Sequence, residues 1–170
     1  MKTFNEKDYY QPIKEYLEKV FENDHKVKVN IYETHSTIPK DIKDTLPNIN
    51  KVSNYYSYKP DLIGLYDSKR SIIIEVKDDP LRIEDLYQLK RYSEITVPNA
   101  AFLISPLDFL EEELRLVKST ELEHICNYYV LRDKDIYRKK INIGIIDCNY
   151  SKENIQIKDI NFYPEVSLHM

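Results

Sequence analysis

Three residues with side chains able to act on a phosphate ester lie close together in the sequence. Asp61 follows a proline and opens one short apolar run, and Glu75 and Lys77 end the next such run. Hydrolysis of a phosphodiester bond needs a divalent cation held by oxygen ligands, an aligned water and positive charge beside the phosphate. Two carboxylates and a lysine meet these needs, so the set predicts a metal-dependent phosphodiesterase site.

The two apolar runs, residues 61–66 and 71–77, are predicted as neighbouring strands joined by a turn at 67–70. Side chains alternate along a strand, so Glu75 and Lys77 would share one face while Val76 points into the apolar layer. The main-chain carbonyl of Val76 would stay near the metal edge. For Asp61 to join that face it must stand opposite residue 75 or 77, which requires an odd-numbered hairpin loop or a bulge.

The Pro-Asp61 pair followed by Glu75-x-Lys77 resembles the PD-(D/E)XK nuclease superfamily, which has the restriction-endonuclease-like fold. The resemblance implies that Asp61, Glu75 and the carbonyl of Val76 bind Mg²⁺ or Mn²⁺. It also implies that Lys77 positions the attacking water and stabilises the transition state. The alternative is that Glu75 and Lys77 are solvated residues of an ordinary hairpin.

A further carboxylate is expected on the first helix, where this superfamily often directs an acidic residue at the metal. At about 100° per residue, Glu6 falls on the face of Tyr10, whereas Glu15 falls nearly opposite. A carboxylate on the core-facing side is costly unless it is paired or binds a cation. Glu6 is therefore the predicted catalytic and metal-binding residue, provided that the helix runs unbroken through Pro12.

The helix expected after the Glu75 strand carries Gln88 and Tyr92, which share a face because they are four residues apart. This Q-x-x-x-Y pattern is similar to that of the RecB-like branch of the superfamily, where it contacts nucleic acid near the site. The resemblance thus implies that Gln88 and Tyr92 bind the substrate. It covers roughly residues 5–105.

Hydrophobic periodicity predicts an α/β fold in a single domain of residues 1–170. Helices are predicted over 5–21, 81–93 and 107–117, with a short one ending near 46. Strands are predicted over 26–33, 61–66, 71–77, 100–105, 141–147 and 154–160, and 119–140 is ambiguous and partly helical. Strand–helix–strand order over 71–105 favours a parallel pair with a right-handed crossover. The expected fold is a mixed central β-sheet flanked by helices: an αβββαβ nuclease core with C-terminal helical and strand additions over 106–170.

Composition and charge restrict the remaining function classes. The 170 residues are 42% hydrophobic and carry a formal net charge of −4, which is typical of a globular protein. No apolar run approaches the ~20 residues of a membrane span, and no signal peptide is evident, so a cytoplasmic protein with no membrane partner is expected. The only two glycines cannot form the phosphate-binding loops of nucleotide-binding folds. Low glycine with many Lys, Glu, Ile and Tyr is compatible with a thermophile or with a biased genome.

A basic stretch stands out in this acidic chain, formed by Arg132, Lys134, Arg138, Lys139 and Lys140. It could track a phosphate backbone, or it could be a solvated face before the strand at 141.

These observations predict a metal-dependent nuclease that hydrolyses DNA phosphodiester bonds, with Mg²⁺ or Mn²⁺ as its cofactor. The expected substrate is single-stranded, duplex-end or branched DNA, and a homodimer is one option for the assembly. The alternative is a catalytically silent nucleic-acid-binding or assembly module on the same fold.

Overall fold

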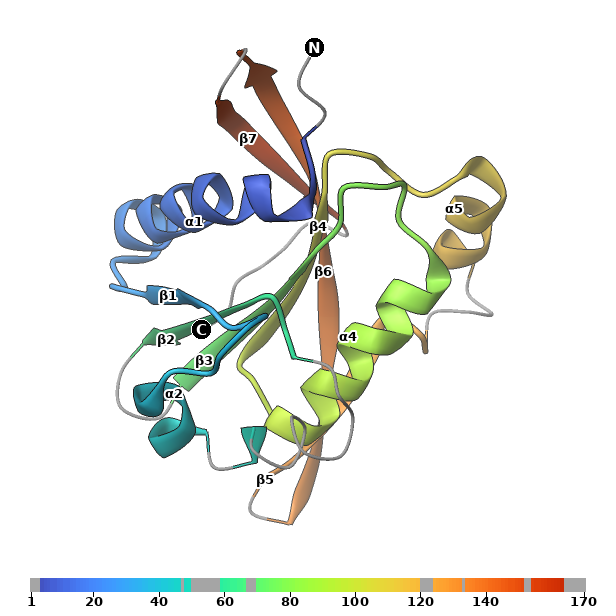
Figure 1. Ribbon diagram of the computed structural model, residues 1–170. Coiled ribbons are helices and arrows are strands. Elements are labelled where there is room, and N and C mark those ends of the chain that lie inside the picture. The colour runs from blue at the N-terminus through green and yellow to red at the C-terminus, as the bar shows by residue number, and fades with distance from the viewer. Residues whose placement is uncertain are drawn as a thin grey trace.

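The computed structural model of the chain describes residues 4–46, 48–49, 59–66, 70–119, 124–132, 134–151 and 154–163. They form an α/β fold in which a seven-stranded mixed sheet is flanked by helices on both faces (Figure 1). No helix in this part of the chain combines the length and the apolar character needed to cross a bilayer.

Helices and strands are interspersed in the first two thirds of the chain, and strands dominate the last third. The helices are η1 (Glu6–Tyr9, a 3₁₀ turn), α1 (Tyr10–His25), α2 (Lys40–Thr45), α4 (Ile83–Thr96) and α5 (Glu111–Lys118). The strands are β1 (Asn30–Glu33), β2 (Leu62–Tyr66), β3 (Arg70–Val76), β4 (Ala100–Ser105), β5 (Asn127–Arg132), β6 (Asp135–Tyr150) and β7 (Ile155–Tyr163).

The sheet has the strand order β1-β2-β3-β4-β6-β5, and β7 pairs with β6. The first three strands are antiparallel, whereas β3–β4 and β4–β6 are parallel. The expected parallel pair around α4 is therefore confirmed. The last two strands, β6 and β7, pair antiparallel. Helix, three strands, helix and strand follow one another in the expected order, with α2 inserted between β1 and β2.

Two apolar layers cover the two faces of the sheet. One contains Ile63 and Ile73 with residues of α2 and α4, and the other contains Leu62 and Ile74 with residues of α1. This division follows the alternation of side chains along β2 and β3. As expected, Val76 is fully buried in the α1 layer.

The first helix differs from the prediction at both ends. Residues 6–9 form a 3₁₀ turn, capped by the Asn5 side chain, which accepts from the N–H of Lys7 at 3.1 Å. The α-helix begins only at Tyr10, so Pro12 lies in its first turn, where a missing N–H costs nothing. At the other end Lys26 adopts a left-handed conformation with φ 57°, which ends the helix. The strand expected from residue 26 therefore begins only at Asn30.

The partly helical prediction for residues 119–140 is wrong within the described range. Residues 127–132 and 135–140 are the two strands of the β5–β6 hairpin, and β6 begins before the predicted boundary at 141. Sequence periodicity failed here because apolar residues occupy both hairpin faces: Val130 is buried, while its neighbours Tyr129 and Leu131 are exposed. Two predicted boundaries differ by a few residues from the structure. Arg70 belongs to β3 rather than to the turn, and α5 begins at Glu111 rather than at 107.

Candidate functional site

The register of β2 against β3 brings Asp61 to the sheet face of Glu75. The ladder runs from Leu62 opposite Ile74 to Tyr66 opposite Arg70, so one further step places Asp61 opposite Glu75. Residues 67–69 lie outside the described residues, but the last pair leaves three residues between its members. The predicted odd-numbered connection is therefore confirmed.

Asp61 is held at the end of the sheet by three hydrogen bonds. Its Oδ2 accepts from the backbone N–H of Val76 at 2.8 Å, and its Oδ1 accepts from the Tyr10 hydroxyl at 2.7 Å. Its own carbonyl accepts from the N–H of Thr34 at 2.8 Å. With only 7% of the residue exposed, the carboxylate is fixed relative to both α1 and β3.

Glu75 lies deeper, with 2% of the residue exposed. Its Oε1 accepts from the Lys77 ammonium at 2.8 Å and from the Gln88 amide at 2.6 Å. Its Oε2 is buried and has no hydrogen-bond partner among the described residues. A buried carboxylate oxygen without a partner is costly, so this atom is a candidate coordination position within the site.

Burial dominates the electrostatics of the two carboxylates. It raises the pKa of Asp61 to about 6, against hydrogen bonds from Val76 and Tyr10 that lower it. Burial, followed by the charge of Asp61, raises the pKa of Glu75 to about 8. For Lys77, burial lowers the pKa, but the carboxylates of Glu75, Asp85 and Asp61 together raise it above its usual value, so the ammonium stays charged at neutral pH.

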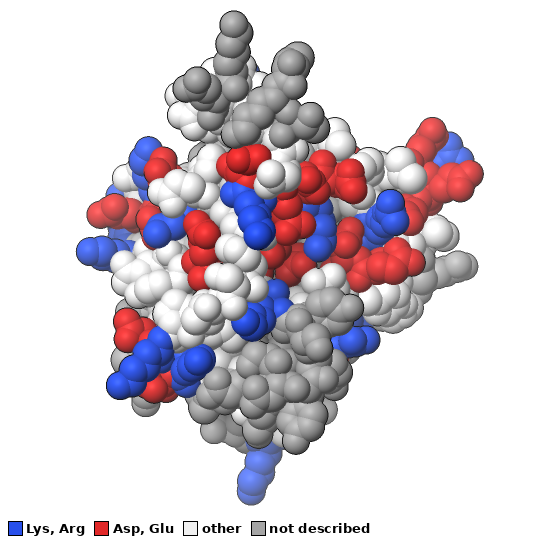
Figure 2. Space-filling view, viewed as in Figure 1, with Lys and Arg blue, Asp and Glu red and all other residues white. Residues whose placement is uncertain are grey.

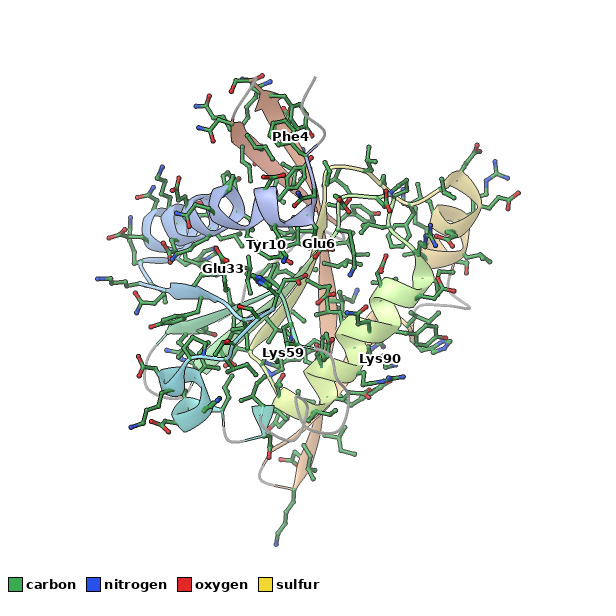
Figure 3. The ribbon with its side chains drawn as sticks, in the orientation of Figure 1. Phe4, Glu6, Tyr10, Glu33, Lys59 and Lys90 are labelled. Atoms are coloured by element: carbon green, nitrogen blue, oxygen red, sulfur yellow. The ribbon has the colours of Figure 1, made fainter. Side chains whose placement is uncertain are left out.

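Glu6 reaches the site through Tyr10, a residue that the sequence analysis did not assign to it. The Tyr10 hydroxyl lies 2.7 Å from Glu6 Oε1 and 2.7 Å from Asp61 Oδ1, and Figure 3 labels Glu6 and Tyr10 side by side at the start of α1. Glu15 is exposed and accepts from Gln11, so Glu6 rather than Glu15 lies beside the site, and a metal-binding role for Glu6 stays a prediction. The i, i+4 spacing of Glu6 and Tyr10 was the signal available in the sequence.

Gln88 and Tyr92 share a face of α4, as their spacing requires, and this face points at Glu75. The Gln88 amide donates to Glu75 Oε1 and lies 3.3 Å from the Tyr92 hydroxyl. Tyr92 is 1% exposed and belongs to the core layer under α4. In this structure the pair therefore supports the carboxylate from inside the protein, and substrate contact by either residue stays a prediction.

The donor set fits a hard divalent cation in its chemistry. Within the described ranges, no group of three or more His, Cys, Asp or Glu side chains lies close enough together to hold a metal. Mg²⁺ is commonly bound through one or two carboxylates and keeps several waters, and Asp61 with the open Oε2 of Glu75 supplies two. Lys77 adds a positive charge that is 19% exposed and so can meet an anion arriving from solvent.

Comparison of the chain with protein-family models, curated proteins and solved structures found no match in any of the three.

Proposed function

We propose that the chain is a metal-dependent nuclease of the PD-(D/E)XK type that hydrolyses DNA phosphodiester bonds. The observation that carries the proposal is the convergence of Asp61, Glu75 and Lys77 at one end of two adjacent strands, with Glu75 Oε2 buried and unpartnered. An ordinary surface hairpin would leave Glu75 solvated, so its burial argues for a ligand role rather than a structural one.

In this proposal Asp61 and Glu75 hold Mg²⁺ or Mn²⁺, and the Val76 carbonyl and Glu6 remain candidate ligands. The metal would supply a Lewis acid and lower the pKa of a bound water. Lys77, oriented by Glu75 and by Asp85 at 3.9 Å, orients the attacking water and neutralises charge on the phosphate. Gln88 keeps Glu75 Oε1 in place.

A catalytically silent nucleic-acid-binding module is the second candidate. It is favoured by the fact that both oxygens of Asp61 and one of Glu75 already have protein partners. In such a module these hydrogen bonds would serve only to stabilise the fold, and Glu75 Oε2 would have no ligand to bind.

Cleavage assays separate the two candidates. Wild-type protein, Lys77→Ala, Glu75→Gln and the exposed control Lys19→Ala would be incubated with single-stranded, duplex and branched DNA in Mg²⁺ or Mn²⁺. The nuclease proposal expects Lys77→Ala and Glu75→Gln to lose about 10²-fold or more in rate and Lys19→Ala to cut like wild type. DNA binding without cleavage of any substrate by the wild type would support the silent module instead.

A further inference from the structure

The β5–β6 hairpin projects beyond the rest of the sheet. Residues 135–140 of β6 pair only with β5, in a register that runs from Asn127 opposite Lys140 to Arg132 opposite Asp135. The contact of β6 with β4 begins only at Ile141. Figure 1 shows the hairpin as the extension at the lower end of the molecule.

The two faces of the hairpin differ in exposure. Tyr128 and Val130 on the inner face are buried in the core layer under α4. On the outer face Leu131 stands opposite Ile136, and these are 69% and 72% exposed, the highest values among the large hydrophobic side chains described. Adjoining apolar side chains that are exposed and rimmed by polar residues are a feature of interaction surfaces.

Basic side chains flank this apolar pair. Lys134, Arg138 and Lys140 are exposed, and Arg138 stands opposite the exposed Tyr129 on the outer face. Lys139 instead donates to the carbonyl of Asn99 at 2.9 Å, which ties the hairpin to the connection between α4 and β4. Figure 2 shows acidic side chains concentrated in the upper half of this view and a basic side chain at the lower tip. The hairpin is thus a basic arm on a chain with a net charge of −4.

We infer that the β5–β6 hairpin is an arm whose outer face binds duplex DNA. A two-stranded β-ribbon fits a groove of the duplex. Lys134, Arg138 and Lys140 would contact phosphates on either side, and Leu131 and Ile136 would press between bases in the manner of apolar wedges. The inference rests on the proposed function in taking DNA as the substrate, and it adds the preference for a duplex and the place where it is gripped.

A second copy of the chain is the other occupant that this apolar pair would suit. The surrounding charge favours DNA, because a polyanion gains from every lysine and arginine on the arm. In a two-fold dimer formed through this face, the basic side chains of both copies would meet, and their like charges would repel.

DNA binding measured in a chelator tests the arm without any cleavage. Fluorescence anisotropy would compare a short blunt duplex with the matching single strand over a range of salt concentrations. Lys134→Ala/Lys140→Ala should weaken duplex binding about tenfold and lower the salt slope by about 0.9 for each phosphate that is no longer neutralised. Leu131→Ser/Ile136→Ser should weaken duplex binding more than single-strand binding. The matched control Lys19→Ala/Lys43→Ala removes two exposed lysines of α1 and α2 and should bind like wild type.

Two results would overturn the inference that the hairpin binds duplex DNA. One is duplex affinity and salt slope unchanged in both hairpin variants while their melting temperatures match wild type. The other is dissociation of a dimer in sedimentation of the Leu131/Ile136 variant with DNA binding intact, which would assign the face to a second copy. Failure of the proposed function would give a different result. If the hairpin binds duplex DNA but the protein cleaves no DNA in Mg²⁺ or Mn²⁺, the nuclease proposal is wrong and the inference about the hairpin stands.

Discussion

The Tyr10 hydroxyl lies 2.7 Å from Asp61 Oδ1 and thereby joins the first helix to the end of the sheet. The same oxygen lies 2.7 Å from Glu6 Oε1, although a hydroxyl has one proton to donate. Tyr10 is 1% exposed, so water cannot easily replace either contact. Glu6 is therefore connected to Asp61 through Tyr10, which makes the tyrosine a positioning residue in the candidate site.

Tyr10→Phe should lower Mn²⁺ affinity about tenfold, because a hydrogen bond to a charged group contributes about 1.5–3 kcal/mol. If Glu6 acts through Tyr10, Glu6→Gln should have little further effect once Tyr10→Phe is present. Isothermal titration of the two single variants and the double variant measures this coupling. Tyr9→Phe is the matched control, since Tyr9 is also buried but bonds to Tyr150. Additive losses would show that Glu6 binds the metal independently of Tyr10.

The stability of the metal-free protein should fall as the pH rises from about 5 to about 8, because burial raises the pKa of Asp61 to about 6 and of Glu75 to about 8. Both values lie above those of an unfolded chain, near 4. The folded state therefore binds these protons more tightly, and the stabilisation is complete at low pH and lost as each group ionises.

For Asp61 alone the loss is at most about 3 kcal/mol, at about 1.4 kcal/mol per pKa unit. Thermal melts in a chelator across this pH range measure it. Asp61→Asn and Glu75→Gln should flatten the dependence, Glu15→Gln should not, and added Mn²⁺ should restore stability at the alkaline end. A melting temperature that rises with pH over this range would contradict the raised pKa values of the two buried carboxylates.

Gln88→Leu distinguishes support of Glu75 from contact with the substrate. Gln88 donates to Glu75 Oε1 at 2.6 Å, and removal of a group that orients a metal ligand typically costs 10–100-fold in metal affinity. We expect Mn²⁺ affinity to fall by about that factor while duplex binding in a chelator stays near the wild-type value. Weakened DNA binding with unchanged Mn²⁺ affinity would instead assign Gln88 to the substrate, as the Q-x-x-x-Y resemblance implies.

Gly64→Ala should destabilise the fold by about 1–3 kcal/mol, the usual cost of overpacking a core. A Cβ at this position would lie 2.6 Å from Ile72 Cγ1 and 2.9 Å from Val29 Cγ1, so these buried side chains would have to move. Chemical denaturation measures the loss. Ile31→Val, on the neighbouring strand, removes one buried methyl group and should cost about 0.5–1.5 kcal/mol, which calibrates the comparison. A neutral Gly64→Ala would show that β2 and β3 are packed less tightly than the structure indicates.

The local sequence determined several elements of the fold and the direction of several side chains of the site. Alternation along residues 71–77 fixed the shared face of Glu75 and Lys77, because side-chain direction in a strand depends only on parity. The apolar run at 100–105 gave β4 with its bounds. Helical phase chose Glu6 over Glu15, and Glu6 meets Tyr10 across the junction between the 3₁₀ turn and the α-helix.

Only the tertiary structure decided how far each group is removed from water and what it meets there. The open Oε2 of Glu75, the bond from Gln88 to Glu75 and the bridge from Tyr10 to Asp61 join residues on different elements. No pattern within one element encodes these contacts, because each depends on how α1 and α4 dock against opposite faces of the sheet. The types and spacing of Asp61, Glu75 and Lys77 indicated the chemistry that they could perform. Their burial, and hence the raised pKa values of the two carboxylates, arose from packing.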